Sequence, residues 1–331
     1  MCAVENGMDV VRLARGRFAI EGIIGLAPRD KTDAISGLTD VGPYCRETGL
    51  RHITVETYNL SKESDKRALL DAEIDVLLVV GWQRLIPEWL IEHCAVAAIG
   101  VHGSAGGITG GRGRSPQNWA LMLGCPSFEV STFFVDPGVD SGDVLDSRQF
   151  DLAPDDDIRM SHLKVSAATV DMIEAGLASG AISERRGTPQ PTEGIRYMPQ
   201  RRPEDGAIDW RLSARDLVNF VRALTRPYPG AACGSLRVWR ARALLGDFPG
   251  SHGTVLAHLA GGELVVRAGE AAVLLDDWEA PKVPAIGSAL PCADAAEQMR
   301  GIIARHTEKH PELPISEDVL RYAHRLGADR L

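Results

Sequence analysis

The stretch Ala95-Val-Ala-Ala-Ile-Gly-Val101, continued by His102-Gly-Ser104 and a glycine-rich run to Gly113, decides the fold that the sequence predicts. An apolar run without polar interruption is typical of a parallel strand covered on both faces. Asp75-Val-Leu-Leu-Val-Val80 repeats this pattern one helix earlier. His102 therefore follows a buried strand, at the edge where open parallel sheets bind ligands.

Strand and helix patterns alternate around this segment. Further strands are expected at residues 18–26, 52–56 and 128–135, and helices at 41–49, 61–72, 87–93, 115–123 and 157–178. This alternation predicts an α/β fold with a doubly wound, mostly parallel sheet of the Rossmann type. The chain reaches the turn Glu5-Asn-Gly7 almost at once. The first strand of such a sheet is therefore expected to be truncated or replaced.

The second half of the chain has a different composition. Residues 187–203 hold four prolines among polar residues, which is typical of a linker. A helix at 214–224 and several short strands with glycine-rich turns follow, which predict a small β-barrel of OB-like type. The expected domains are residues 1–186, a linker at 187–203, the barrel at 204–288 and a helical tail at 289–331.

Composition narrows the class of protein. The chain has 331 residues and a net charge of −9, which disfavours nucleic acid as a partner. No apolar run is long enough for a membrane helix, and no signal peptide is visible, so a cytoplasmic protein is expected. The cysteines form no C-x-x-C pair, and no metal is expected. His306 and His310 have ligand spacing on a helix, but a solvated face is the favoured interpretation.

His102 and Asp140 are the candidates for proton transfer. A histidine is suited to proton transfer near neutral pH, and Asp140, in Gly138-Val-Asp-Ser-Gly142, can orient or charge-stabilise the ring. Taken alone, a histidine at a strand end and an aspartate in a glycine turn are common structural features.

Several motifs in the right order resemble the formyltransferase family, which includes methionyl-tRNA formyltransferase and the sugar N-formyltransferases. They are Val101-His-Gly-Ser104, Arg112-Gly113, Pro116-Gln-Asn-Trp119, Gly138-Val-Asp-Ser-Gly142, and the loop Gly81-Trp-Gln-Arg-Leu-Ile-Pro87. Asp205-Gly-Ala-Ile-Asp-Trp210 and residues 221–230 are similar to the family's C-terminal domain. The resemblance covers roughly residues 8–280.

The resemblance implies a mechanism and a co-substrate. His102 would take the proton of the attacking amine, and Asp140 would hold the protonated ring. The co-substrate would be 10-formyltetrahydrofolate. Its implied pocket consists of Trp82, Arg84, Leu85, Ile86, Pro87, Val139 and Asp140.

The sequence departs from the family at the oxyanion donor. Gly100 stands where the family has asparagine, and the following loop is longer than in the family. Asn118 or a backbone N–H of the glycine-rich loop could replace the donor; alternatively, Asn118 only caps or packs its helix.

The resemblance leaves the acceptor open. A small-molecule amine, such as a nucleotide-linked amino sugar, is the leading expectation, with methionyl-tRNA or hydroxyornithine as alternatives. A non-catalytic folate-binding protein derived from such an enzyme is the alternative of another class. A homodimer is also left open.

Overall fold

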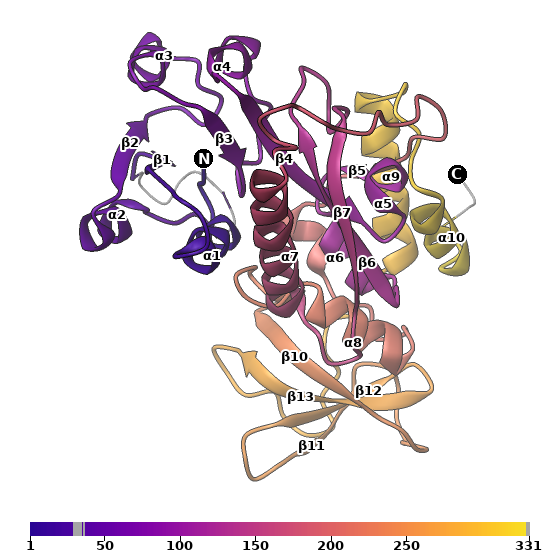
Figure 1. Ribbon diagram of the computed structural model, residues 1–331. Coiled ribbons are helices and arrows are strands. Elements are labelled where there is room, and N and C mark those ends of the chain that lie inside the picture. The colour runs from indigo at the N-terminus through magenta and orange to yellow at the C-terminus, as the bar shows by residue number, and fades with distance from the viewer. Residues whose placement is uncertain (29–34, 36, 329–331) are drawn as a thin grey trace. The chain divides into compact units, whose positions relative to one another are not determined.

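The computed structural model describes residues 1–28, 35 and 37–328, which form two compact units (Figure 1). Unit 1 comprises Met1–Arg112, Glu129–Phe150 and His162–Gly194. Unit 2 comprises Gly113–Phe128, Asp151–Ser161 and the chain from Ile195 onward. The chain leaves unit 1 for the last time after Gly194, within the segment 187–203. Each unit therefore contains residues that are distant in sequence.

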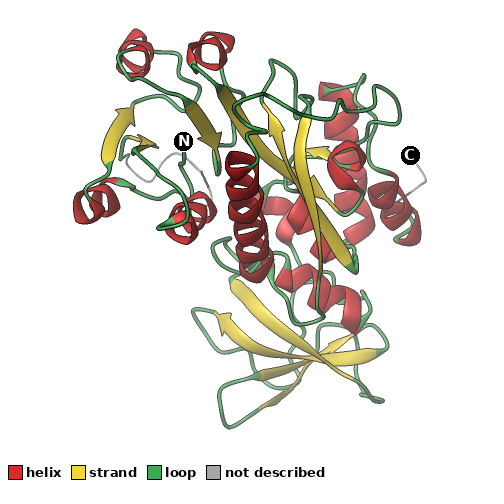
Figure 2. Ribbon diagram, viewed as in Figure 1, coloured by secondary structure: helices red, strands yellow, loops and turns green. Residues whose placement is uncertain are grey.

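The strands of unit 1 form two sheets (Figure 2). β1 (Gly22–Leu26) and β2 (Arg51–Val55) are parallel. The second sheet has the order β3 (Val76–Val79), β4 (Ala97–Ser104), β6 (Ser127–Phe134), β7 (Val144–Asp151). β3 and β4 are parallel, whereas β6 is antiparallel to β4. The predicted α/β fold with a parallel sheet is confirmed.

Residues 1–4 join the two sheets of unit 1. The Cys2 N–H donates to the Ile24 carbonyl at 3.0 Å, and Cys2 bridges Gly25 in parallel. On the other side the Ala3 N–H donates to the Gly81 carbonyl at 3.1 Å. The first strand, which the sequence predicted to be truncated or replaced, is therefore present in short form at residues 1–4. So few residues carry no detectable periodicity, so the sequence could not locate this strand.

Helices cover both faces of these sheets, as a doubly wound fold requires. Their bounds are α1 (Glu5–Ala14), α2 (Gly42–Thr48), α3 (Glu63–Leu70), α4 (Glu88–His93), α5 (Gly107–Gly110) and α7 (Ile158–Ala178). Val10 of α1 and Val170 of α7 pack against Val80 on one face. Leu69 of α3 and Leu90 of α4 belong to a second cluster. In the part of the chain that is described, no helix is long and apolar enough to cross a membrane.

Gly7 lies in the first turn of α1, at a position with no room for a side chain. A Cβ built on Gly7 would lie 2.5 Å from the Val80 carbonyl oxygen and 2.6 Å from the Cys2 sulfur. Any side chain there would push α1 away from the sheet. Residues 5–7, which the sequence predicted as a turn before the helix, form the first turn of α1, and the glycine allows close packing of helix and strand.

Unit 2 contains an open antiparallel sheet with the order β11-β12-β13-β10-β9. The strands are β9 (Ala231–Cys233), β10 (Leu236–Leu244), β11 (Val255–His258), β12 (Leu264–Ala268) and β13 (Ala271–Glu279). The remaining elements are β5 (Arg112–Gly113), which begins in unit 1, α6 (Pro116–Met122), β8 (Tyr197–Met198), a 3-10 turn (Pro203–Gly206), α8 (Ala214–Arg222), α9 (Ala295–Lys309) and α10 (Glu317–Arg325).

The prediction of a closed barrel is wrong, because the two edges of this sheet are covered instead of paired with each other. At one edge, β9 is only three residues long, and Ala207 forms a bridge with Ala232 of this strand. At the other edge, the Val255 N–H donates to the Ser288 carbonyl at 2.9 Å. Short irregular segments thus satisfy the edge groups that closure would have satisfied. Sequence patterns predicted the strands but could not show which edges meet.

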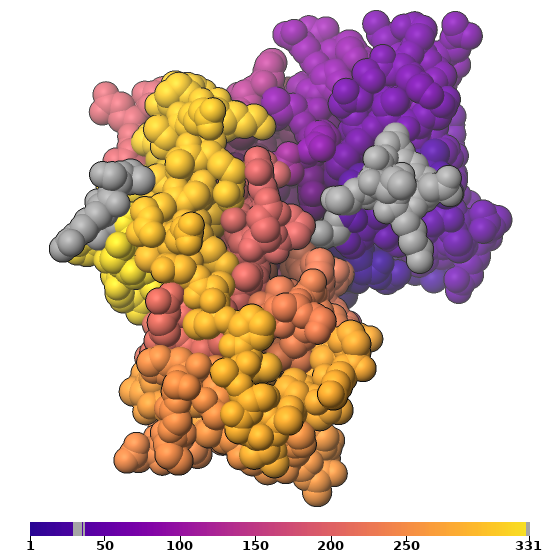
Figure 3. All heavy atoms as spheres, turned by 180° about the vertical axis from the view of Figure 1, so that it is seen from behind, coloured from indigo at the N-terminus to yellow at the C-terminus, as the bar shows by residue number. Residues whose placement is uncertain are grey.

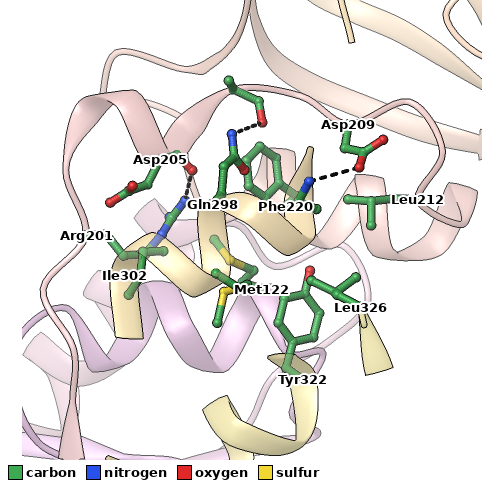
Figure 4. A pocket seen from close by; sticks show the side chains of 13 residues that line it. Met122, Arg201, Asp205, Asp209, Leu212, Phe220, Gln298, Ile302, Tyr322 and Leu326 are labelled. Carbon is green, nitrogen blue, oxygen red and sulfur yellow. Dashed lines mark hydrogen bonds between the residues drawn. The ribbon is translucent and has the colours of Figure 1, made fainter. Parts of the chain in front are cut away.

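Asp209 fastens the C-terminal tail of unit 2 (Figure 4), which Figure 3 draws in yellow. Its carboxylate accepts hydrogen bonds from the Ala295 N–H at 3.0 Å, at the start of α9, and from Arg211 Nε at 2.9 Å. Gln298 of α9 donates to the Ala207 carbonyl at 3.1 Å. The tail helices therefore pack over a cavity of about 20 Å³, which has room for about one water molecule.

We expect Asp209 to make stability depend on acid pH. Burial opposes its ionisation, but the hydrogen bonds from Arg211 and from backbone N–H groups outweigh burial and lower its pKa to about 2. A depressed carboxylate pKa adds stability above the unfolded value, and this stability is lost as pH falls toward the folded value. Asp209→Asn should lower the unfolding free energy at pH 7 by about 1–2 kcal/mol, since exposed Arg211 is partly screened by solvent. Urea unfolding between pH 5 and 2 checks this, and an unchanged pH dependence in the variant would contradict it.

Candidate functional site

His102 and Asp140 lie side by side in unit 1. The His102 Nδ1 atom is 3.4 Å from the Asp140 Oδ2 atom, and the histidine side chain is 8% exposed. β6 is antiparallel to β4, so the 135–143 loop starts level with Ala98 and must return along the sheet to reach His102. Asp140 adopts a φ of 51°, a left-handed conformation that aspartate tolerates better than most residues. The sequence predicted His102 just after a buried strand, but the residue lies within β4, where it pairs with Ser131 of β6, and the 135–143 loop folds back to reach it.

The second ring nitrogen of His102 is also occupied. Its Nε2 atom lies 2.9 Å from the Gly111 carbonyl oxygen. A neutral imidazole has one N–H, whereas the protonated ring has two. An acceptor oxygen lies at each ring nitrogen, so a neutral ring can donate to only one of the two. For His102 to accept a proton at Nε2, the Gly111 carbonyl must move away.

Gly100 has no room for a side chain. It lies directly opposite Phe133 in the β4–β6 pair, and an added Cβ would be 2.6 Å from the Phe133 Cζ atom. Phe133 is buried, with 5% of its surface exposed. The position where the family carries its asparagine is therefore filled by an aromatic ring from the neighbouring strand.

The 81–87 loop begins level with His102, because Val79 pairs with Gly100 one strand away. Tyr58 holds this loop: its hydroxyl accepts a hydrogen bond from the Gln83 N–H at 2.9 Å, and the Arg84 guanidinium stacks 5.0 Å from its ring. The remaining residues of the predicted pocket differ in how far their side chains are exposed to solvent. Trp82 and Ile86 are buried, Leu85 is 60% exposed and Val139 36% exposed, and Pro87 precedes α4.

Asn118 lies in unit 2, where its side chain is buried. Its Nδ2 atom donates to the Ala223 carbonyl at 2.6 Å, which ties α6 to the end of α8. One amide hydrogen is thus engaged within the unit. This contact agrees with the alternative in which Asn118 packs its helix and does not serve as an oxyanion donor.

Asn118→Ala is expected to lower the unfolding free energy by about 1–3 kcal/mol, because the buried Ala223 carbonyl loses its donor. Turnover should change only a few-fold. Thermal unfolding and steady-state kinetics on one preparation measure both quantities. A stable variant with about 100-fold lower turnover would instead support an oxyanion role.

No group of three histidine, cysteine or carboxylate side chains suited to a metal ion occurs within residues 1–28, 35 and 37–328. His306 is buried, and its Nε2 atom lies 2.8 Å from the Leu313 carbonyl oxygen. The expectation of a solvated face is therefore wrong for His306. The residue fixes the turn after α9 instead.

Fold and site together define a Rossmann-type α/β protein with a histidine–aspartate pair at its sheet. The model of the "Formyl transferase" family matches residues 43–173, and that of "Formyl transferase, C-terminal domain" matches residues 201–288. The two ranges together span well over half of the chain. The chain belongs to the formyltransferase family.

Relatives of this chain include two bacterial methionyl-tRNA formyltransferases. That of Symbiobacterium thermophilum is 32% identical over 213 residues, which cover 61% of this chain and 62% of the relative. That of Myxococcus xanthus is 33% identical over 209 residues, which cover 62% and 65%. The matched part of the chain thus spans less than two thirds of either relative.

Solved structures show the same fold at low identity. A variant of HypX from Aquifex aeolicus has a TM-score of 0.58 and 18% identity, covering 90% of this chain and 50% of that protein. An N-formyltransferase from Helicobacter canadensis, in complex with folinic acid and dTDP-3-aminofucose, has a TM-score of 0.53 and 10% identity, covering 82% and 96%.

Proposed function

We propose that the protein transfers a formyl group from 10-formyltetrahydrofolate to a primary amine. The observation that carries this proposal is the 3.4 Å approach of His102 to Asp140 in a member of the formyltransferase family. The relatives named above support the same chemistry. In 10-formyltetrahydrofolate the formyl group is bound to a nitrogen, and this nitrogen can act as the leaving group.

In the proposed reaction the amine nitrogen attacks the formyl carbon, and the bond from that carbon to the folate nitrogen breaks. The amine proton passes to Nε2 of His102 after the Gly111 carbonyl has given way, and the departing folate nitrogen finally takes a proton. Asp140 stabilises the positive charge on the ring. Since Phe133 blocks a side chain at Gly100, a backbone N–H of the 105–111 loop would face the negative charge on the formyl oxygen.

The 82–87 loop fits a flat, partly apolar ligand. The Trp82 indole N–H is buried and has no hydrogen-bond partner in the described part of the chain. Leu85 and Val139 expose apolar surface in the same unit. A ligand with ring-bound acceptors and an aromatic body, such as the pterin of folate, would use both features. We assign Trp82, Arg84, Leu85, Ile86, Pro87, Val139 and Asp140 to this pocket.

A small-molecule amine, in particular a nucleotide-linked amino sugar, is the proposed acceptor. Recognition of tRNA depends on basic side chains that neutralise phosphates. On the basic strand β10, two arginines are already paired with a carboxylate: Arg240 and Arg242 each lie 2.8 Å from a carboxylate oxygen of Asp276. The net charge of −9 points the same way. Methionyl-tRNA is the second candidate, favoured by the 32–33% identity to the relatives that carry that name.

Incubation with 10-formyltetrahydrofolate and a panel of acceptors tests the proposal. The panel includes nucleotide-linked amino sugars, hydroxyornithine and charged initiator methionyl-tRNA, and mass spectrometry detects the formylated product. Product from one class of acceptor, absent with the His102→Asn variant, is the expected result. Tight binding of 5-formyltetrahydrofolate by calorimetry, without turnover on any acceptor, would instead support a non-catalytic folate-binding protein.

A further inference from the structure

Gln190 connects the two groups that flank the His102 ring. Its Nε2 atom donates to the Asp140 carbonyl at 2.9 Å and to the Gly142 carbonyl at 2.7 Å. Its Oε1 atom accepts from Arg112 Nη2 at 2.8 Å. A single amide therefore bonds both the loop of Asp140 and the segment after the glycine-rich loop.

These contacts close a ring of interactions within unit 1. Asp140 faces Nδ1 of His102, and the carbonyl of Gly111, the residue before Arg112, faces Nε2. Gln190 holds the backbone of Asp140 directly and holds the Gly111 peptide through the side chain of Arg112. Both oxygen atoms that face the imidazole are thus positioned by one residue.

The anchor of Gln190 is rigid. Two residues earlier, Thr188 exchanges both backbone hydrogen bonds with Val144, at 2.7 and 2.8 Å, beside the start of β7. Arg112 is 4% exposed, so its charge acts on the Gln190 amide in a low-dielectric environment. A charged donor polarises the amide and strengthens the bonds that Nε2 donates on the other side.

The 135–143 loop needs such a support. Asp140 has a φ of 51°, a conformation that costs free energy in residues other than glycine and persists when the surroundings enforce it. The bonds from Gln190 to the carbonyls of Asp140 and Gly142 span this position. Without them the loop can relax, and the carboxylate can move away from the ring.

We propose that Gln190 is a positioning residue that fixes the Asp140 carboxylate at Nδ1 of His102 and, until the acceptor amine binds, holds the Gly111 carbonyl at Nε2. It has no contact with the reacting atoms in this role. Its effect on turnover rests on the proposed formyl transfer, whereas its effect on the ring of His102 does not.

Two substitutions separate the contact of Gln190 with the Asp140 loop from its contact with Arg112. Gln190→Glu keeps an acceptor for Arg112 but places a carboxylate oxygen against the Asp140 and Gly142 carbonyls. Arg112→Met keeps the bonds from Gln190 to the loop and removes the other contact. Gln149→Glu makes the same chemical change at an exposed position of β7 in the same unit and serves as the matched control.

The side-chain ¹⁵N resonances of His102 report on the ring directly, whether or not transfer is observed. We expect Gln190→Glu to shift the Nδ1 resonance and Arg112→Met the Nε2 resonance, with no shift in Gln149→Glu. Turnover should fall by about 10–100-fold in Gln190→Glu, with the dissociation constant of 5-formyltetrahydrofolate nearly unchanged.

Folded Gln190→Glu and Arg112→Met proteins with a wild-type His102 spectrum would overturn the proposal. Shifted resonances in a protein that formylates no acceptor would uphold the positioning role and reject the proposed function. Equal losses of folate binding and turnover, with an unshifted spectrum, would show a general structural role and also overturn it.

Discussion

Replacing His102 with asparagine is expected to lower turnover by about 10²–10⁴-fold, the usual contribution of a positioned acid or base. The dissociation constant for 5-formyltetrahydrofolate should remain close to that of the wild type, because proton transfer acts in the transition state and not in ground-state binding. Asp140→Asn should cause a loss of the same order, since the carboxylate lies 3.4 Å from the ring. Single-turnover kinetics with the acceptor identified by mass spectrometry measure each loss.

The double variant of His102 and Asp140 decides whether the two residues act together. Groups that act as one unit give losses that do not multiply. We therefore expect the double variant to be about as slow as the slower single variant. His52→Gln, a histidine on β2 in the same unit, is the control and should retain wild-type turnover. Losses that multiply, or an active His102→Asn protein, would contradict the proposed mechanism.

The second large effect is expected at Gly100 and Phe133. Gly100→Asn should lower the unfolding free energy by about 1–3 kcal/mol, because an overpacked core forces side chains out of their rotamers. Phe133→Ala should cost about 3–5 kcal/mol through lost burial and a cavity. In the double variant the asparagine occupies the space that the ring leaves, so the combined loss should be smaller than the sum. Urea unfolding of the four proteins measures these terms.

The same pair of variants tests the missing oxyanion donor. An asparagine admitted by Phe133→Ala would place an amide where the family carries one. The double variant should then turn over about tenfold or more faster than Phe133→Ala alone, as expected for a gained oxyanion donor. Valine at position 100 in the same background fills space without a donor and is the matched control. Additive unfolding energies and equal turnover would refute the compensation between Gly100 and Phe133.

Local sequence patterns predicted several helices and strands. Apolar runs predicted β3 and β4, and proline at the first turn correctly marked α6. The resemblance around Asp140 implied an approach to His102, and the two side chains lie 3.4 Å apart. The helices and strands depend on residues close together in sequence, where periodicity and turn chemistry act directly.

Other features depended on contacts between distant segments. Residues 1–4 join the two sheets of unit 1, and the five-stranded sheet of unit 2 stays open because short segments cover its edges. Sequence periodicity reports which face of a strand is apolar and is silent on which strand lies beside it. Pairing across the chain therefore had to come from the structure.

The sequence by itself determined the α/β class and the family, whereas its placement of His102 after a buried strand was wrong, because His102 lies within β4. Only the tertiary structure decided that Phe133 fills the place beside Gly100, that Gly111 faces the second nitrogen of His102, and that Gln190 holds both flanking groups. The reason is physical: each of these contacts joins side chains or carbonyls brought together by packing. Close packing is specific to the three-dimensional arrangement and leaves no periodic signal along the chain.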